Sequence, residues 1–173
     1  NEAINIGRVC NIPVEISHFK LSGQNNWGRS KETVPMIINA RKEGLDVTID
    51  QYPYTASSTS LSTLLPDWVL ADGQDSIKAR LANASIRQDV KNAMYARLKK
   101  RKLKHWGYAV VASYGFDSSY NGKSIEQINL LKGRKHKAKF EAETILEIME
   151  HGGASAVFHG MSEDDVKRIM QYP

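Results

Sequence analysis

Alternation of apolar and polar residues predicts a short strand over residues 13–18. Within it Val14, Ile16 and His18 would share one face, because side chains along a strand point to alternate sides. Lys20 has the same parity, so an imidazole and an ammonium would project side by side from the end of this strand.

A second strand is predicted over residues 45–52, where Val47 and Ile49 would form the apolar face. The opposite face would be polar: Thr48, Asp50 and Tyr52. Such a pattern is typical of a barrel strand whose outer face packs on helices and whose end carries a polar site.

Helical spacing of apolar residues predicts a helix between these two strands. The helix would begin near Ser30 or Thr33 and end at Gly44, a residue common in the left-handed cap position. A strand, a helix and a strand in this order predict a βαβ unit with parallel strands and a right-handed crossover.

The residue composition of the sequence changes after Tyr54. The Ser- and Thr-rich stretch 55–63 is predicted to be a loop or lid, and helices and short strands follow it. Capping-box patterns begin at Ser85 and Ser124. We expect an α/β chain with three parts: residues 1–59 as a barrel segment, 60–153 as a mostly helical insertion, and 154–173 as the return to the barrel.

Composition limits the function classes. The 173 residues suit about one domain with a real core, and the formal charge of +5 permits an acidic partner without requiring one. Cys10 is the single cysteine, which excludes an intrachain disulfide and a zinc site built from cysteines. No apolar run approaches a membrane span, and the compartment, cytoplasmic or periplasmic, stays open.

Local spacing alone does not define a metal site around His18, since no HxH, HxxEH or cysteine pair stands near it. Three blocks are nevertheless informative as a set: Ile16-Ser17-His18-Phe19-Lys20, Asn26-Trp27-Gly28-Arg29-Ser30-Lys31-Glu32-Thr33, and Asp50-Gln51-Tyr52-Pro53-Tyr54-Thr55-Ala56-Ser57-Ser58-Thr59. With the later stretch Phe158-His159-Gly160-Met161-Ser162-Glu163-Asp164-Asp165-Val166, they resemble consecutive blocks of the D-aminoacylase (N-acyl-D-amino-acid deacylase) family.

The resemblance implies an amidohydrolase (β/α)₈ TIM-type barrel, of which this chain would hold the sixth and seventh strands. It implies zinc as cofactor, with His18 as a zinc ligand, and Lys20 and Tyr52 as binding residues for an N-acyl-D-amino acid. The chemistry is suitable, because neutral imidazole binds zinc well and an ammonium and a phenol can bind a carboxylate.

The same resemblance implies several parts that would lie outside this sequence. The family's HxH motif, its metal-ligand cysteine and a further histidine would precede Asn1, and its general-base aspartate would follow Pro173. Cys10 would not be the family cysteine. We therefore expect an internal fragment that contains no catalytic residue, is inactive alone and self-associates through exposed apolar edges.

Two other readings remain open: an amidohydrolase that acts on another amide, such as a dipeptide or a cyclic amide, and a non-catalytic basic binding module. The second depends on the basic run 97–104, which we interpret as the solvated end of a helix because no nucleic-acid motif accompanies it. We expect neither a nucleic acid nor a membrane as partner. His159 could face the pocket mouth, and the other histidines are expected at the surface: His105, His136 and His151.

Overall fold

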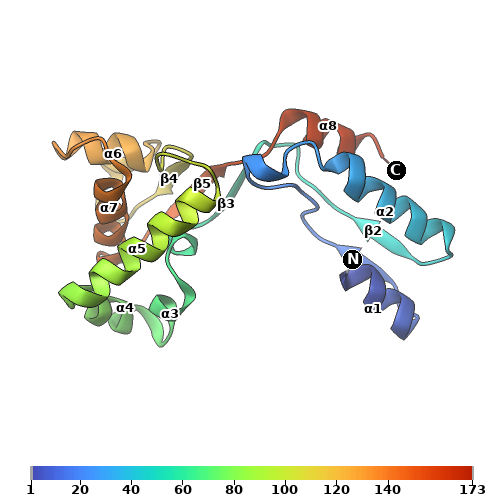
Figure 1. Cartoon of the computed structure of the whole chain (residues 1–173), viewed down its shortest axis with the longest axis horizontal. Helices are drawn as coiled ribbons and strands as arrows, with labels where there is room; N and C mark the ends of the chain where they lie inside the picture. Colours follow the sequence, from blue (N-terminus) through green and yellow to red (C-terminus); the bar gives the residue numbers. More distant parts are fainter. Residues whose placement is uncertain (1, 173) are drawn as a thin grey trace. The chain divides into compact units, whose positions relative to one another are not determined.

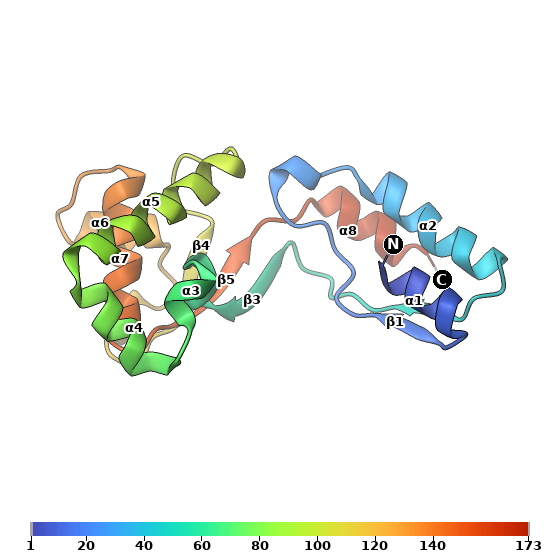
Figure 2. The ribbon, with the colours of Figure 1, turned by 60° about the horizontal axis from the view of Figure 1, so that its bottom comes forward.

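The computed structural model describes residues 2–172, which fall into two compact units. Unit 1 comprises residues up to Thr55 together with the segment from Gly160 onward, and unit 2 comprises Ala56–His159. Figures 1 and 2 show the elements of both units. Sequence patterns placed the boundaries at 59/60 and 153/154; the structure places them at 55/56 and 159/160.

Unit 1 contains the βαβ motif expected from the sequence. Its elements are α1 (Glu2–Cys10), β1 (Val14–Ile16), the 3₁₀ helix η1 (Gln24–Asn26), α2 (Ser30–Lys42), β2 (Val47–Ile49) and α8 (Glu163–Met170). Strands β1 and β2 pair in parallel, with Val14 opposite Val47, and α2 connects them. Gly44 follows α2 with φ of 88°, in agreement with the predicted helix end.

A small apolar core holds unit 1 together. Ile4 of α1, Ile37 and Ala40 of α2, and Val47 of β2 are buried against one another. Helix α8 lies beside α2 in both views (Figures 1 and 2), so the last helix of the chain packs on the crossover helix of the βαβ motif.

Unit 2 is a three-stranded antiparallel sheet with helices. Its elements are β3 (Ala56–Ser60), η2 (Leu61–Leu64), α3 (Asp67–Leu70), α4 (Gly73–Ala82), α5 (Ala84–Lys100), β4 (Ala109–Ser113), η3 (Ser118–Tyr120), α6 (Ile125–Leu131), α7 (Ala138–Glu150) and β5 (Ser155–His159). Strand β5 is central and pairs antiparallel with both β3 and β4.

Two local predictions in unit 2 were wrong. The stretch 55–63 is not a loop, because Ala56 pairs with His159 and Ser60 with Ser155 along β3 and β5. This pairing also assigns both strands to unit 2. Helix α5 does not begin with a capping box at Ser85; the side chain of Asn83 caps it by accepting hydrogen bonds from the amides of Ser85 and Ile86. The capping box at Ser124 is confirmed.

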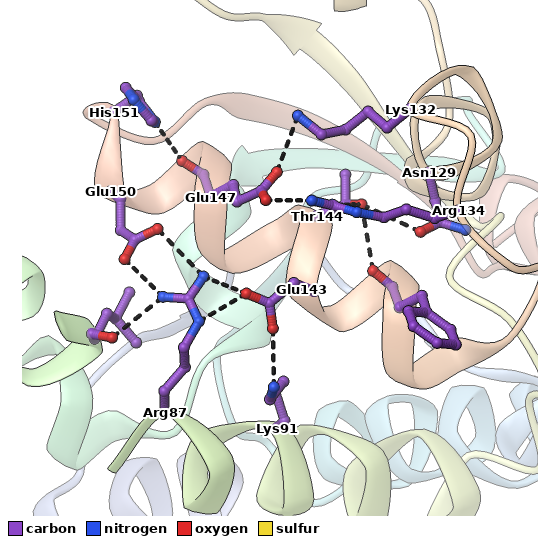
Figure 3. A network of polar contacts seen from close by, with 12 residues as sticks. Arg87, Lys91, Asn129, Lys132, Arg134, Glu143, Thr144, Glu147, Glu150 and His151 are labelled. Atoms are coloured by element: carbon purple, nitrogen blue, oxygen red, sulfur yellow. Dashed lines mark hydrogen bonds and ion pairs between the residues drawn. The ribbon is translucent and has the colours of Figure 1, made fainter. Parts of the chain in front are cut away.

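Helix α7 is amphipathic and packs into the core of unit 2. Its apolar face, with Ile145, Leu146 and Ile148, is almost fully buried in the larger core. Its acidic side chains form an ion-pair network (Figure 3): Glu143 and Glu150 bind Arg87 of α5, and Glu147 binds Lys132 and Arg134. Burial of the apolar face stabilises the packing of α7, and the basic partners compensate the charges of the partly buried glutamates on its other face.

Candidate functional site in unit 1

His18 lies in the turn that follows β1 rather than in the strand itself. The strand ends at Ile16, and His18 adopts a left-handed backbone with φ of 54°. The expected common face of Val14, Ile16 and His18 therefore does not extend to the histidine, because a turn breaks the strand alternation. The imidazole is exposed to solvent. A non-glycine residue in this conformation needs support from its surroundings, and such residues cluster at functional sites.

Asp50, which follows β2, provides that support. Its Oδ1 accepts a 2.7 Å hydrogen bond from the His18 amide, and its main-chain carbonyl accepts one of 2.8 Å from the Phe19 amide. The hydrogen bond from the His18 amide is the largest cause of the lowered pKa of the Asp50 carboxyl. The carboxylate is thus ionised at neutral pH and fixes the turn that carries His18.

Lys20 and Tyr52 both lie next to His18. Lys20 Nζ donates a 3.1 Å hydrogen bond to the main-chain carbonyl of His18 and lies 5.4 Å from the centre of the Tyr52 ring. The rings of His18 and Tyr52 have centroids 5.8 Å apart. Residues from two chain segments therefore form one group of an imidazole, an ammonium and a phenol.

These three side chains line one small pocket with apolar residues of unit 1, among them Phe19, Met161 and Ile169. The ammonium and the phenol at this pocket are suited to a carboxylate ligand. Lys20 and Tyr52 are only partly buried, so a ligand would meet them without a large desolvation cost.

Asp165 of α8, which also lines this pocket, fixes the start of helix α2. Its carboxylate accepts hydrogen bonds from the amide of Gly28 at 2.7 Å and from the amide and hydroxyl of Ser30, at the start of α2. Burial alone would raise the pKa of Asp165, but these hydrogen bonds and the charge of Arg168 outweigh burial and lower it. Sequence reasoning expected Ser30 or Thr33 to cap α2; the cap comes instead from a residue far along the chain.

His18 fits a metal as one ligand of a larger set. Its exposed imidazole can present a ring nitrogen to an ion, and imidazole is a suitable donor for zinc. Within residues 2–172 the single group of three or more metal-ligand side chains lies in unit 2 and does not include His18. The described residues therefore do not supply a set of three or more metal ligands that includes His18.

The remaining sequence candidates lie elsewhere. His159 ends β5 in unit 2 and is exposed, and Cys10 is an exposed free thiol. In the basic run, Arg97 donates a 2.7 Å hydrogen bond to the Leu65 carbonyl and Arg101 one of 3.1 Å to the Tyr108 hydroxyl. Part of this run thus supports the fold of unit 2. Within residues 2–172, no helix has the length and apolar character needed to cross a membrane.

His136 is exposed, as expected, and His105 is partly buried. They stack on each other and contact Glu126 and Glu141. No sequence motif marks these four positions as a group. His151 is exposed, as expected, and its ring nitrogen contacts the Glu147 carbonyl.

In sequence and fold, the chain is similar to amidohydrolases that act on N-acyl-D-amino acids. The resemblance to the D-aminoacylase family inferred from the sequence blocks is thereby confirmed. No protein-family model matches the sequence.

Two relatives and two solved structures illustrate the similarity. A 60-residue stretch, 35% of this chain and 12% of the relative, is 52% identical to the D-aminoacylase of Alcaligenes xylosoxydans xylosoxydans. The N-acyl-D-glutamate deacylase of that organism is 41% identical over 61 residues, again 35% of this chain and 12% of the relative.

A solved D-aminoacylase with a binuclear metal centre matches 98% of this chain and 26% of its own length, with a TM-score of 0.57 and 28% identity. The N-acyl-D-glutamate deacylase of Bordetella bronchiseptica, solved with zinc and a phosphonate mimic of the tetrahedral intermediate, matches 99% of this chain and 27% of its own length, with a TM-score of 0.62 and 25% identity. The chain thus spans about a quarter of the solved proteins that it matches.

Proposed function

We propose that this chain is a segment of a zinc-dependent amidohydrolase that hydrolyses N-acyl-D-amino acids to a carboxylate and a D-amino acid. The observation that carries the proposal is the convergence of His18, Lys20 and Tyr52 at one pocket, in a chain similar to D-aminoacylases. In this reading β1 and β2 are the sixth and seventh strands of a (β/α)₈ barrel, and unit 2 is an insertion.

His18 would serve as a zinc ligand, held in place by the hydrogen bond between its amide and Asp50. Bound zinc would supply Lewis acidity that polarises the scissile carbonyl and activates water near neutral pH. Lys20 would bind the free carboxylate of the substrate by a charge-assisted hydrogen bond, and the Tyr52 hydroxyl would donate a second one. These contacts would orient the substrate in the pocket that His18 also lines.

We further propose that the 173 residues alone are inactive and self-associate. His18 belongs to no group of three or more metal-ligand side chains among residues 2–172, and a single imidazole does not form a catalytic zinc site. Unit 1 also exposes large apolar side chains near its two-stranded sheet: Ile6, Val9 and Ile12. An open sheet edge with exposed apolar residues favours association with another chain.

The test compares this chain with the longer protein that would contain it. Both are assayed with N-acetyl-D- and N-acetyl-L-amino acids, with and without a zinc chelator. We expect the longer protein to hydrolyse D-substrates in a chelator-sensitive manner and the 173 residues to show no turnover. Activity toward a dipeptide or a cyclic amide in place of N-acyl-D-amino acids would overturn the substrate assignment, and turnover by the 173 residues would overturn the proposed need for further ligands.

A further inference from the structure

Four metal-ligand side chains meet in unit 2. They are His105, Glu126, His136 and Glu141, and one ligand atom from each lies within 4.8 Å of all the others. His105 follows α5, Glu126 lies in the first turn of α6, His136 precedes α7, and Glu141 lies in the first turn of α7. Three helices and their connections therefore converge on one polar cluster.

The cluster consists of two imidazole–carboxylate pairs. His105 Nδ1 lies 2.6 Å from Glu141 Oε1, and His136 Nε2 is hydrogen-bonded to Glu126 Oε1. The two imidazole rings stack with centroids 4.1 Å apart. Each hydrogen bond uses a ring nitrogen and a carboxylate oxygen, the same atoms that would bind a metal ion in place of the shared proton.

Glu141 is the buried member of the cluster, with no exposed surface. Its Oε2 accepts a 2.7 Å hydrogen bond from the Trp106 amide, which leaves Oε1 directed to the cluster. A buried carboxylate is costly unless it is paired or coordinates a cation. A backbone donor that orients one oxygen of a ligating carboxylate is a common outer-shell feature of metal sites.

Gly107 provides the space for the second carboxylate. A Cβ atom at this position would lie 2.3 Å from Glu126 Oε2, so only glycine leaves room for Glu126 as it stands. On the other side, His105 and His136 line an open groove of unit 2. The groove gives an ion a path to the two histidines of the cluster.

We propose that His105, Glu126, His136 and Glu141 bind a divalent transition-metal ion of the zinc type. Two imidazoles and two carboxylates are donors that zinc accepts, whereas calcium and magnesium prefer oxygen ligands alone. With bonds of about 2.0–2.2 Å, tetrahedral ligand atoms lie roughly 3.3–3.6 Å apart. The whole cluster lies within 4.8 Å, so a bound ion would separate the two hydrogen-bonded imidazole–carboxylate pairs without a large movement of the four side chains. Four protein ligands leave no open position, so the ion joins the three helices and stabilises unit 2.

The test uses zinc as the probe and the 173-residue chain carrying His18→Asn, so that His18 contributes no zinc binding. We expect calorimetry to give one zinc ion per chain, and cobalt to give the intense visible absorption of a tetrahedral site. Replacing His136 with Asn in this background is expected to weaken zinc binding at least about tenfold, because a ligand is lost. The control is His151→Asn, which changes an exposed histidine outside the cluster and should leave zinc affinity unchanged.

Thermal melting supplies a second readout. Zinc should raise the melting temperature of the His18→Asn chain and of its His151→Asn derivative but not of the His136→Asn derivative. If His136→Asn does not fold, Glu126→Gln takes its place with the same expected loss. The proposal is overturned if zinc does not bind stoichiometrically, or if both ligand variants bind it as tightly as the control. Because the readouts are zinc affinity and melting, the outcome is independent of hydrolase activity.

Discussion

The amide of His18 donates a 2.7 Å hydrogen bond to Oδ1 of Asp50, so the residue that follows β2 fixes the turn that follows β1. The turn contains a left-handed histidine, with φ of 54°. A conformation of this kind costs on the order of 1–3 kcal/mol and persists when its surroundings enforce it. Asp50 is therefore a positioning residue for the proposed zinc ligand.

The first prediction concerns Asp50 in the longer protein. Asp50→Ala should weaken zinc binding by about 10- to 100-fold, because loss of an orienting partner costs that much at other metal sites. Asp50→Asn keeps an oxygen acceptor for the His18 amide and should retain most of the affinity. Zinc affinity is measured by competition with a chelator, and equal losses in both variants would contradict a role through this hydrogen bond.

The second prediction concerns substrate binding by Lys20. Lys20→Met should raise KM for N-acetyl-D-amino acids about 10- to 100-fold, which corresponds to one lost charge-assisted hydrogen bond, with a smaller change in kcat. Tyr52→Phe should raise KM by less, because it removes a neutral donor. Lys31→Met, which changes an exposed lysine of α2, is the matched control. A normal KM in Lys20→Met would show that the ammonium does not hold the carboxylate.

The third prediction concerns the stability of unit 1. Asp165→Ala leaves the amides of Gly28 and Ser30 without their acceptor and should cost roughly 1–3 kcal/mol of stability. The opening free energy is read from hydrogen exchange of the α2 amides. Asp164→Ala removes the exposed neighbouring carboxylate in α8 and should change stability by less than about 0.5 kcal/mol. Similar exchange in the two variants would disprove the capping role.

The fourth prediction concerns the acid stability of unit 2. Burial alone would raise the pKa values of Glu143 and Glu147, but their basic partners outweigh burial and lower both. A carboxyl whose pKa is lower in the folded state stabilises the fold above its unfolded pKa of about 4.3 and loses this contribution as pH falls through the folded pKa. Protection of α7 amides from exchange should therefore decrease from about pH 5 downward.

Arg87 makes this acid dependence testable. Arg87→Met removes the basic partner of Glu143 and Glu150. Stability at pH 7 should therefore decrease, and the loss of α7 amide protection between about pH 6 and pH 3, the range around the ordinary carboxyl pKa of about 4, should become smaller. Lys78→Met changes an exposed lysine of α4 and serves as the control. An unchanged pH profile in Arg87→Met would show that the network does not cause the effect.

The features predictable from the sequence were those with a local signal. Alternation and helical spacing predicted the parallel pair β1 and β2 and the helix between them. The roles of His18, Lys20 and Tyr52 came from the resemblance of their sequence blocks to a family and remain a proposal. The detailed geometry was less accessible. The left-handed turn at His18 depends on Asp50 of the next strand, which no alternation pattern encodes.

Features that depend on tertiary pairing were missed. The Ser- and Thr-rich sequence of β3 has no apolar alternation, and it becomes a strand because β5 pairs with it. The histidine–glutamate cluster has no motif spacing, since His105 and Glu141 are brought together by the packing of α7. One local feature could have indicated that His105 is not fully exposed: its neighbour Trp106 is a large apolar residue, and Trp106 is buried in the core of unit 2.

The zinc content of the longer protein with His18→Asn decides whether His18 is a zinc ligand, and His159→Asn is the matched control. We expect His18→Asn to contain at least one zinc ion fewer per chain than the unmodified protein and to lose hydrolysis of N-acetyl-D-amino acids. We expect His159→Asn to keep both its zinc and its activity. If His18→Asn retains its full zinc content and its activity, His18 is not a zinc ligand and the proposed site is wrong.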